Sequence, residues 1–301
     1  MLIVRLAICA LLLATGLSAR GEPAVTLAVV GDVQLGRGVA RVTAQHGPDY
    51  PFAQVQDRLR RADLALFNLE CALSQDGVPI KKRYSFRADP VAAGGLARAG
   101  LDVAVLANNH SVDCGRDRLA ETMETLRQRG IASVGAGEEA AAAAAPLIVE
   151  RNGLRVAILA RSFVLPDRVI YREDAPTVAM YDPETILEEV RAARREADMV
   201  IVSLHWGIEY AREPQESQRR IAHALVDAGA ALVLGHHPHT PQPVECYRNG
   251  LIAYSLGNFV FDPAGEKGRH GLLLTCTLTR EGVQNYVATP VKITNAQPRA
   301  E

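Results

Sequence analysis

The sequence predicts an α/β protein, on two observations. Short apolar runs rich in β-branched residues alternate with longer segments in which apolar residues recur at helical spacing. The composition is that of a globular chain, because 48% of the residues are hydrophobic and 22% are charged. Strands and helices that alternate along one chain are typical of sheets with helices packed on their faces. The 301 residues are enough for one large α/β domain or two small ones.

The two kinds of segment give explicit boundaries. The predicted strands are Val25–Val30, Leu64–Phe67, Val103–Leu106, Leu147–Val149, Arg155–Leu159, Met199–Leu204, Ala231–Leu234, Leu251–Tyr254, Leu272–Leu278 and Tyr286–Ile293. The predicted helices are Phe52–Ala62, Pro90–Ala99, Arg116–Arg129, Pro183–Ala197 and Glu216–Ala228. Several helices are followed by a glycine in the C-cap position, namely Gly100, Gly130 and Gly229.

Smaller signals complete this outline. Asp182 is expected to cap the helix that opens with Pro183. The run Ala140–Ala145 predicts a short helix that Pro146 stops. No Gly/Ser/Pro-rich linker divides the chain, so we expect one domain over residues 24–295 and a flexible tail over residues 296–301.

The N-terminal stretch has the layout of a secretory signal peptide. Arg5 precedes the apolar run Leu6–Leu13, and small residues follow it. We expect cleavage after residue 21 and a mature chain that begins near Glu22. This predicts an exported protein, periplasmic or extracytoplasmic, and the alternative is an uncleaved N-terminus that anchors the protein to the membrane.

Charge and cysteine content limit the partners and the cross-links. The formal net charge of −1 does not favour nucleic-acid binding, which requires a clearly basic domain. Four cysteines lie beyond the predicted signal, at Cys71, Cys114, Cys246 and Cys276. They allow three disulfide pairings, and free thiols are an equal alternative in a domain of this size.

Polar side chains of metal-binding type follow successive predicted strands. They are Asp32, Glu70, Asn109 with His110, His205, and the histidines of Gly235–His239. Each has an ordinary explanation by itself, as a turn residue, a helix-terminal charge or a core histidine. Together they indicate a metal site, because ligands collect at the carboxyl edge of α/β sheets. Carboxylate, amide and imidazole ligands favour Mn, Fe or Zn, and the set is sufficient for two ions with Glu70 as the bridge.

The stretch LVLGHHPH, Leu232–His239, holds three of the eight histidines. Because the residue before a proline avoids the helical region, we expect His237 to be extended. In an extended segment His237 and His239 face one side and His236 faces the other. His237 and His239 are therefore the predicted ligands, and His236 is the alternative if the loop bends at Gly235.

Basic residues near these positions are candidates for substrate binding. Arg37, Lys82 and Arg87 are the predicted substrate-binding residues, and Lys81 and Arg83 lie in the same segment. Positive side chains beside a metal site would hold a phosphate or a polycarboxylate. The alternative is a run of charges on a solvated surface. Trp206, next to His205, packs beneath the site or lines its rim.

An ordered series of motifs resembles a known family. GDVQLGR, FNLE, ANNH, SLHWG, GHHPH and YSLGNFVFD occur in this order between Thr26 and Asp262, with DYPF and YSFRADP between them. The series resembles that of the bacterial capsule-synthesis CapA proteins of the poly-γ-glutamate group. Their domain is similar to the calcineurin-like metallophosphoesterases. The resemblance implies a metallophosphoesterase-like sandwich of two mixed β-sheets flanked by helices.

The resemblance also implies roles for individual residues. Asp32 would be the first metal ligand, Asn109 a further ligand, and His110 the acid that meets the leaving group. Two positions depart from the phosphoesterase pattern. Gln34 stands where those enzymes have a histidine, and Glu70 stands where they have a bridging aspartate.

Two functions are therefore expected for an exported protein that acts in capsule or poly-γ-glutamate synthesis or export. The first is a metal-dependent hydrolase acting on a phosphoester or amide bond. The second is a non-catalytic accessory subunit in the cell envelope, with a structural metal site. The expected partners are an anionic polymer or a phosphorylated substrate and a membrane synthase complex, without nucleic acid.

Overall fold

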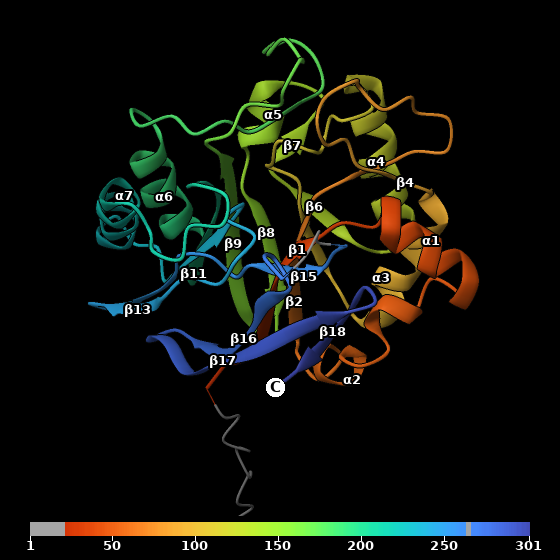
Figure 1. The fold of residues 1–301 in the computed structure, drawn as a ribbon. Helices are drawn as coiled ribbons and strands as arrows, with labels where there is room; N and C mark the ends of the chain where they lie inside the picture. The colour runs from red at the N-terminus through yellow and green to blue at the C-terminus, as the bar shows by residue number, and fades with distance from the viewer. Residues whose placement is uncertain (1–21, 263–265) are drawn as a thin grey trace, which may run out of the picture.

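The computed structural model describes residues 22–262 and 266–301, so the predicted signal peptide lies outside the described residues. Two large sheets form its centre (Figure 1). The first sheet has the strand order β18 (Gln297–Ala300), β17 (Gly282–Thr294), β16 (His270–Thr279), β1 (Val25–Val33), β2 (Leu64–Leu69), β5 (Val103–Val105) and β6 (Ala132–Val134), and β15 (Asn258–Val260) also pairs with β1. The second sheet has the order β13 (Val244–Tyr247), β14 (Gly250–Ala253), β12 (Leu232–His236), β11 (Met199–His205), β9 (Leu154–Ser162) and β8 (Leu147–Arg151).

Both sheets are mixed. In the first sheet β1, β2, β5 and β6 run parallel, whereas β16, β17 and β18 pair antiparallel. In the second sheet β9, β11, β12 and β14 run parallel, and β8 and β13 are antiparallel edge strands. The parallel strands bring their carboxyl ends to one edge of each sheet, where polar loop residues can meet.

Helices cover the outer faces of the two sheets (Figure 1). The first sheet is covered by α1 (Arg37–His46), α2 (Gln56–Leu59), α3 (Ala93–Ala99) and α4 (Arg116–Gln128), with the short helices η1 (Tyr50–Phe52) and η2 (Pro90–Ala92). The second sheet is covered by α6 (Ile186–Glu196) and α7 (Glu216–Asp227). The remaining elements are α5 (Ala140–Ala144) and two small strand pairs, β3 (Ala72–Leu73) with β4 (Arg87–Ala88) and β7 (Ala136–Gly137) with β10 (Thr177–Val178).

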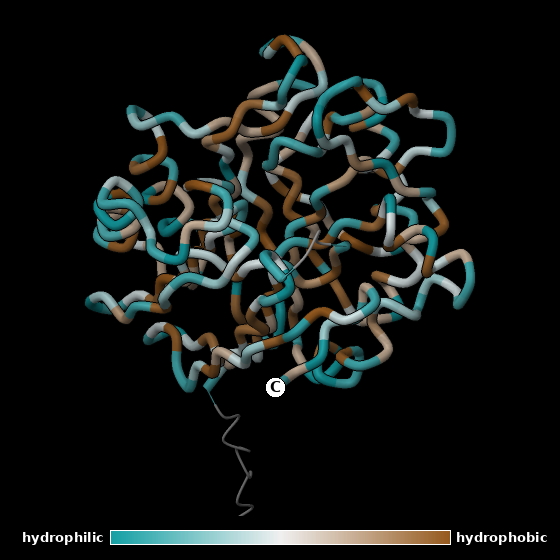
Figure 2. Tube along the Cα trace, viewed as in Figure 1, coloured by the Kyte–Doolittle hydropathy of each residue, from teal (hydrophilic) through white to brown (hydrophobic). Residues whose placement is uncertain are grey.

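The core explains why the central strands are apolar throughout. In β1, Val25, Leu27 and Val29 face the second sheet, whereas Ala28 and Val30 face the helices. Side chains alternate along a strand, so a strand buried on both faces requires apolar residues at every position. Figure 2 shows this pattern as hydrophobic strands in the centre and hydrophilic segments outside. The molecule is a four-layer sandwich of helices, two sheets and helices, and the α/β prediction is confirmed.

The structure differs from the sequence expectations at several boundaries. The predicted helix Phe52–Ala62 is divided into η1 and the short α2. Helix α6 begins at Ile186, because the Asp182 carboxylate accepts a hydrogen bond from Glu184 N in a turn that precedes the helix. The expected short helix before Pro146 is present as α5.

Two segments at the sheet edges also differ. Helix α1 was not expected, because its residues continue directly from the first predicted ligand loop. The predicted tail contains β18, which pairs with the end of β17 after a turn with positive φ at Asn295 and Ala296. Gln297 fixes this strand by donating a hydrogen bond from its side chain to Tyr50 O.

Two further properties concern the cysteines and the membrane. Cys71, Cys114, Cys246 and Cys276 are all free thiols in the structure. Across the described ranges, the helices lack the combination of length and apolar character that a bilayer span requires.

Glycines allow close approach where strands end. A Cβ atom on Gly31 would lie 1.9 Å from Gly257 O, and one on Gly235 would lie 1.8 Å from Tyr254 O. Asp32 N donates a hydrogen bond to the same Gly257 O at 2.9 Å. Gly31 therefore permits the backbone contact that positions Asp32, and Gly235 does the equivalent before His236.

We expect Gly31→Ala to lower the free energy of unfolding by about 1–3 kcal/mol, because the backbone must move to accept the methyl group. Urea denaturation of the purified protein measures this change. Gly94→Ala in α3 is the control, since a Cβ atom there meets only the flexible end of Arg98. Unchanged stability of Gly31→Ala would contradict the close approach.

Candidate metal centre

Three buried side chains converge at the carboxyl ends of the first sheet and the loop after β12. Asp32 is the last residue but one of β1, Glu70 follows β2, and His239 follows β12. One ligand atom from each lies within 4.8 Å of the other two. All three residues are buried, so the charges of the two carboxylates cannot be solvated by bulk water. The arrangement has the size and donor set of a cation site.

Asn68 holds the two carboxylates in place. Its Nδ2 donates to Asp32 Oδ1 at 2.9 Å and to Glu70 Oε2 at 3.2 Å. Asn108 Nδ2 in turn donates to Asn68 Oδ1 at 3.0 Å. These bonds leave the other oxygen of each carboxylate directed away from Asn68.

His239 is oriented by a neighbouring amide. Asn258 Oδ1 lies 2.9 Å from His239 Nδ1, so this nitrogen donates its proton and Nε2 is left for another contact. His239 Nε2 lies 3.6 Å from Glu70 Oε1. Orientation of one ring nitrogen by an amide or carboxyl group is typical of histidines that bind metal through the other nitrogen.

The protonation of the cluster follows from its burial and its charges. Burial opposes the charge of Asp32, but hydrogen bonds from His236 and His239 outweigh it and hold the pKa of Asp32 well below its usual value. Burial and the charge of Asp32 raise the pKa of Glu70 well above its usual value. Burial also disfavours a charged His239, yet Glu70 and Asp32 outweigh it and raise the pKa of His239 to about 10.

A second group of ligand-type side chains lies beside the first. His205 Nε2, at the end of β11, lies 2.8 Å from Asn109 Oδ1. The rings of His205 and His237 are 4.8 Å apart, and those of His237 and His239 are 6.0 Å apart. Burial and the charge of His239 lower the pKa of His237 to about 4. Burial, followed by the charge of His237, holds the pKa of His205 well below its usual value. Both imidazoles are therefore neutral at pH 7 and able to act as ligands.

Buried atoms without hydrogen bonds test whether these residues fit a metal. Glu70 Oε1, His205 Nδ1 and His237 Nδ1 are buried and have no hydrogen-bond partner among the residues that the structure describes. The same holds for both amide atoms of Gln34, which is fully buried two residues after Asp32. Unsatisfied buried polar atoms are rare, and their concentration here fits residues that hold divalent cations.

The histidine loop has a strained backbone. His237 has φ 94° and His239 has φ 56°, so the expected extended conformation of His237 is wrong. Hydrogen bonds from Trp206 N to His236 O and from Tyr210 N to Pro238 O hold the loop in this shape. Non-glycine residues at positive φ cost about 1–3 kcal/mol each and concentrate at functional sites.

The bend changes the expected separation of the three histidines. His239 reaches the carboxylate cluster and His237 reaches His205. His236 does not face away, because its Nδ1 lies 3.2 Å from Asp32 Oδ1. All three histidines therefore turn toward the site, with His236 against the first carboxylate.

His110 belongs to a separate chain of contacts at the edge of the cluster. Its Nδ1 lies 2.8 Å from Asp113 Oδ2, and its Nε2 lies 3.8 Å from Glu70 Oε1. Phe86 covers the ring, with centroids 4.3 Å apart. Burial lowers the pKa of His110 although Asp113 opposes this shift. Asp113 thus fixes the tautomer, and Nε2 faces the carboxylate cluster.

The predicted substrate-binding residues have different surroundings. Lys82 is buried, pairs with Asp113 and donates to Asn109 O, so its ammonium group supports the His110 contacts and does not face solvent. Arg87 donates to the carbonyl oxygens of Ser74 and Gln75. Lys82 and Arg87 lie close in the sequence to the predicted metal ligands, but the polar contacts of both side chains are with groups of the protein itself.

Arg37, the third predicted substrate-binding residue, lies at the partly exposed rim of the site. Its guanidinium lies 5.6 Å from the Tyr84 ring centroid and 5.7 Å from that of Phe86, and its side chain is 43% exposed. Because Phe86 also contacts the His110 ring, Arg37 lies one aromatic ring away from the site. Trp206 is buried and donates from Nε1 to Tyr254 O, so it packs beneath the site and not at the rim.

Residues that orient the site were missed in the sequence. Asn68, Asn258 and Asp113 are buried and bond directly to the predicted site residues. Asn68 and Asn258 stand in the motifs FNLE and YSLGNFVFD, and Asp113 follows His110 by three residues. The motifs could have pointed to Asn68 and Asn258, and the spacing from His110 could have pointed to Asp113. The side chains that these three residues bind depend on tertiary contacts.

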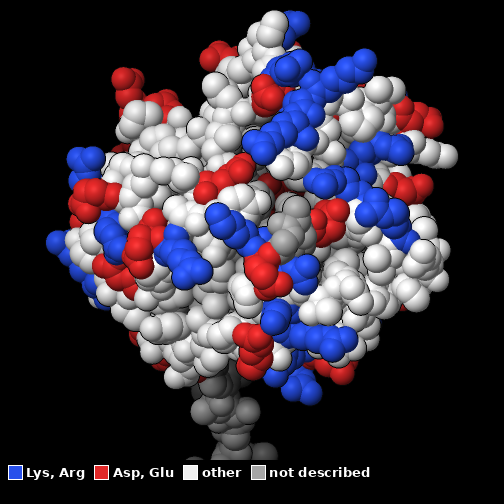
Figure 3. All heavy atoms as spheres, viewed as in Figure 1, with Lys and Arg blue, Asp and Glu red and all other residues white. Residues whose placement is uncertain are grey.

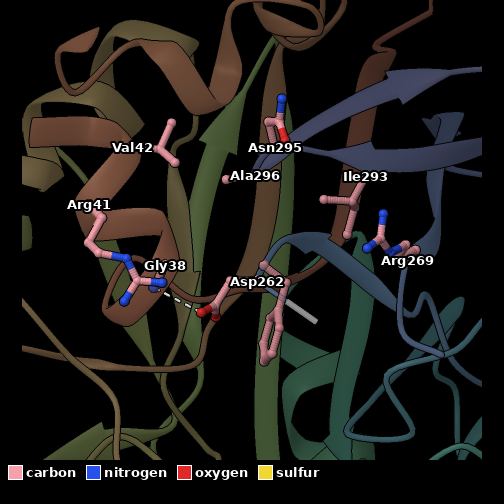
Figure 4. A pocket seen from close by; sticks show the side chains of 9 residues that line it. Gly38, Arg41, Val42, Asp262, Arg269, Ile293, Asn295 and Ala296 are labelled. Carbon is pink, nitrogen blue, oxygen red and sulfur yellow. Dashed lines mark hydrogen bonds between the residues drawn. The ribbon is translucent and has the colours of Figure 1, made fainter. Parts of the chain in front are cut away.

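A cavity of about 350 Å³ lies beside the start of α1 and is separate from the carboxylates. Asp262 lines it and accepts a hydrogen bond from Gly38 N at 2.8 Å (Figure 4). Phe261 also lines it and is 5.1 Å from the His239 ring. This cavity therefore adjoins the site through one aromatic ring, while the predicted ligands lie deeper.

Comparisons with known proteins agree with the sequence resemblance. The family model described as bacterial capsule synthesis protein PGA_cap matches residues 26–263. The PGA biosynthesis protein CapA of Bacillus subtilis is 31% identical over 280 residues, covering 92% of this chain and 74% of that protein. A probable polyglutamine synthesis accessory protein of Mycobacterium tuberculosis is 30% identical over 319 residues, covering 89% of this chain and 84% of that protein.

Solved structures agree with the fold. The sulfate thiohydrolase SoxB of Thermus thermophilus, solved with glycerol, superposes with a TM-score of 0.53 at 15% identity, covering 91% of this chain and 56% of that chain. At this identity the likeness concerns the fold alone. The expected metallophosphoesterase-like sandwich of two mixed sheets flanked by helices is confirmed.

We expect Asp32→Asn to weaken binding of Mn²⁺ or Zn²⁺ by more than about 100-fold, because it removes a buried negative charge from the cluster. Metal content after dialysis, measured by mass spectrometry, and titration calorimetry test this. Asp57→Asn on the exposed side of α2 is the matched control. Equal metal content in the two variants would place the cation elsewhere.

The pKa shifts predict that metal binding releases protons. At pH 7.5 the metal-free His239, with a pKa of about 10, carries a proton that a metal ligand must lose. Because the pKa of Glu70 is raised, Glu70 also binds a proton as the pH falls, and the metal must displace this proton too. The affinity for the metal should therefore decrease toward acidic pH. Calorimetry in two buffers of different ionisation enthalpy measures the proton count. Identical heats in both buffers would contradict the protonated state.

Proposed function

The chain belongs to the family of bacterial capsule synthesis proteins described as PGA_cap, and we propose that it acts on an anionic capsule polymer through a metal-dependent, hydrolase-like site. The polymer class that we propose is poly-γ-glutamate, which the motif series implies, and the Bacillus subtilis relative is itself named a PGA biosynthesis protein. The observation that carries the catalytic part is the buried cluster of Asp32, Glu70 and His239.

The residues divide into two ligand groups around Glu70. Asp32, Glu70 and His239 would hold one ion, with Gln34 beside them. Asn109, His205 and His237 would hold a second ion together with Glu70. Mn, Fe or Zn suits this mixed donor set, and such metals supply Lewis-acid activation of the bond that is cleaved.

His110 is the proton donor in this proposal. Asp113 accepts the Nδ1 proton, so Nε2 is the free nitrogen, which would first take up a proton and then pass that proton to the leaving group. Lys82 pairs with Asp113 and keeps that carboxylate in position. Arg37 at the rim would bind a carboxylate or phosphate of the polymer, since its guanidinium is partly exposed and bears donors in a fixed fork beyond the Nε that lies 3.8 Å from Asp262 Oδ2.

The second candidate is a non-catalytic accessory subunit of an envelope synthase complex. Two observations favour it. Gln34 is a weaker ligand than the histidine of the phosphoesterase pattern, and one relative is named a probable accessory protein. In this case the same residues would hold a structural metal, and export of the polymer would not require proton transfer from His110. Export to the cell envelope, by a cleaved or an anchoring N-terminus, is part of both candidates.

We expect His110→Ala to lower turnover about 10²–10⁴-fold while metal content stays unchanged, because the ring faces the cluster without being needed as a ligand. The assay uses an aryl phosphodiester and poly-γ-glutamate, each with and without chelator. His46→Ala at the exposed end of α1 is the matched control.

The same measurements separate the two candidates. Undiminished turnover by His110→Ala would remove the acid role. A wild-type protein that retains less than one metal ion after reconstitution, or that cleaves neither substrate, would favour the accessory candidate. Export of polymer by cells that carry His110→Ala then shows whether proton transfer matters for the process.

A further inference from the structure

A groove lined by arginines lies outside the carboxylate cluster. It has a volume of about 520 Å³ and lies between the start of α4, Ile80 and the segment 168–172. Its four arginines are Arg116, Arg118, Arg168 and Arg172. Figure 1 shows the loop between β9 and β10 at the top of the molecule, on the side of α4. Figure 3 shows Lys and Arg side chains gathered in a stripe across this upper part.

The charges of the groove are only partly compensated by the protein. Arg118 Nη1 lies 3.1 Å from Glu121 Oε2, and Arg172 Nη2 lies 2.8 Å from Asp174 Oδ2. Arg116 Nη1 donates to a carbonyl oxygen, that of Pro176, so its charge meets no carboxylate through this bond.

Two further observations show that the charge of the groove is mainly positive. Within the described residues Arg168 forms no hydrogen bond or ion pair, and it is exposed. Asp117 is the acidic residue among those that line the groove. An excess of positive charge around a concave surface attracts anions.

Apolar side chains narrow the class of anion. Ile80, Val169 and Ile170 line the same groove, and Ile170 is 84% exposed. A polyphosphate has no carbon atoms to cover these side chains, whereas a chain of carboxylates on alkyl segments has both features. Burial of exposed aliphatic surface stabilises the second ligand by about 25 cal/mol per Å² and does not stabilise the first.

Residues that line the groove are neighbours in the sequence of the residues that contact His110. Cys114 and Gly115 line it and follow Asp113 directly. Ile80 N donates to Asp113 O at 2.7 Å. The segment that starts at Ile80 continues through the exposed Lys81 and Arg83 to Phe86, whose ring contacts that of His110. An extended ligand in the groove would therefore have basic side chains along its way to the site.

We propose that this groove binds an extended polycarboxylate chain with alkyl segments, such as a γ-linked glutamate polymer, and presents it to the carboxylate cluster. The inference rests on the proposed function for the choice of polymer. Each exposed ion pair contributes at most about 1 kcal/mol, so free glutamate binds negligibly. Several pairs made by one chain add up, because each contact after the first is intramolecular.

Binding of a fluorescently labelled γ-linked oligoglutamate to the metal-loaded protein tests the groove. We expect the double variant R168Q/R172Q to bind about tenfold more weakly than the wild type, with a shallower dependence on salt. The matched control is R58Q/R195Q. Both arginines are exposed; Arg58 has no carboxylate contact among the described residues, and Arg195 pairs with Glu188. This control should bind within about twofold of the wild type. Metal content of both variants verifies that the fold is intact.

Three results are decisive. Weak binding by R168Q/R172Q alone supports the groove. Equal binding by both variants overturns it and leaves the proposed function intact, because the polymer then binds at another surface. Binding of inorganic polyphosphate, sensitive to R168Q/R172Q, without binding of oligoglutamate overturns the polycarboxylate assignment, and the hydrolysis assay then judges the proposed function separately.

Discussion

Two buried carboxylates impose the main constraint on this molecule. Asp32 and Glu70 lie within 4.8 Å of one another and of His239, in a region where water cannot solvate them. Like charges at this distance in a low-dielectric environment are unfavourable unless positive charge compensates them. The protein alone compensates by protonation, since the pKa values of Glu70 and His239 are both raised. A divalent cation would replace those protons, and the surrounding amides orient the same atoms for both states.

The backbone around the cluster is arranged to bring these groups together. Gly31 and Gly235 remove side-chain volume where β1 and β12 approach neighbouring carbonyl groups. His237 and His239 adopt positive φ in the loop after β12, Tyr210 does so in the loop after β11, and Arg37 does so at the start of α1. Strain of this kind persists only where the surrounding structure enforces it. The two tightly packed sheets supply that enforcement, because their strands are buried on both faces.

Much of the fold and of the site was predictable from local sequence. The strands β1, β2, β9 and β11 were found because a strand buried on both faces reads as a continuous apolar run. Most strands of two to four residues were missed, since so few residues carry too little periodic signal. Helix α1 has 10 residues and was missed because they continue directly from the first predicted ligand loop. The position of Asp32, Glu70 and His205 after successive strands was informative because parallel strands share a carboxyl edge.

The amino-acid sequence by itself determined the α/β class, the family and the residue types that collect at the sheet edge. Only the tertiary structure decided how the histidines divide, because positive φ at His237 and His239 turns all three toward the site against the extended preference of a residue before proline. Tertiary packing likewise placed Lys82 on Asp113 and not on the ligand side. The partner of a side chain can belong to a segment far away in the sequence, and a local sequence pattern does not show which distant segment will lie beside it.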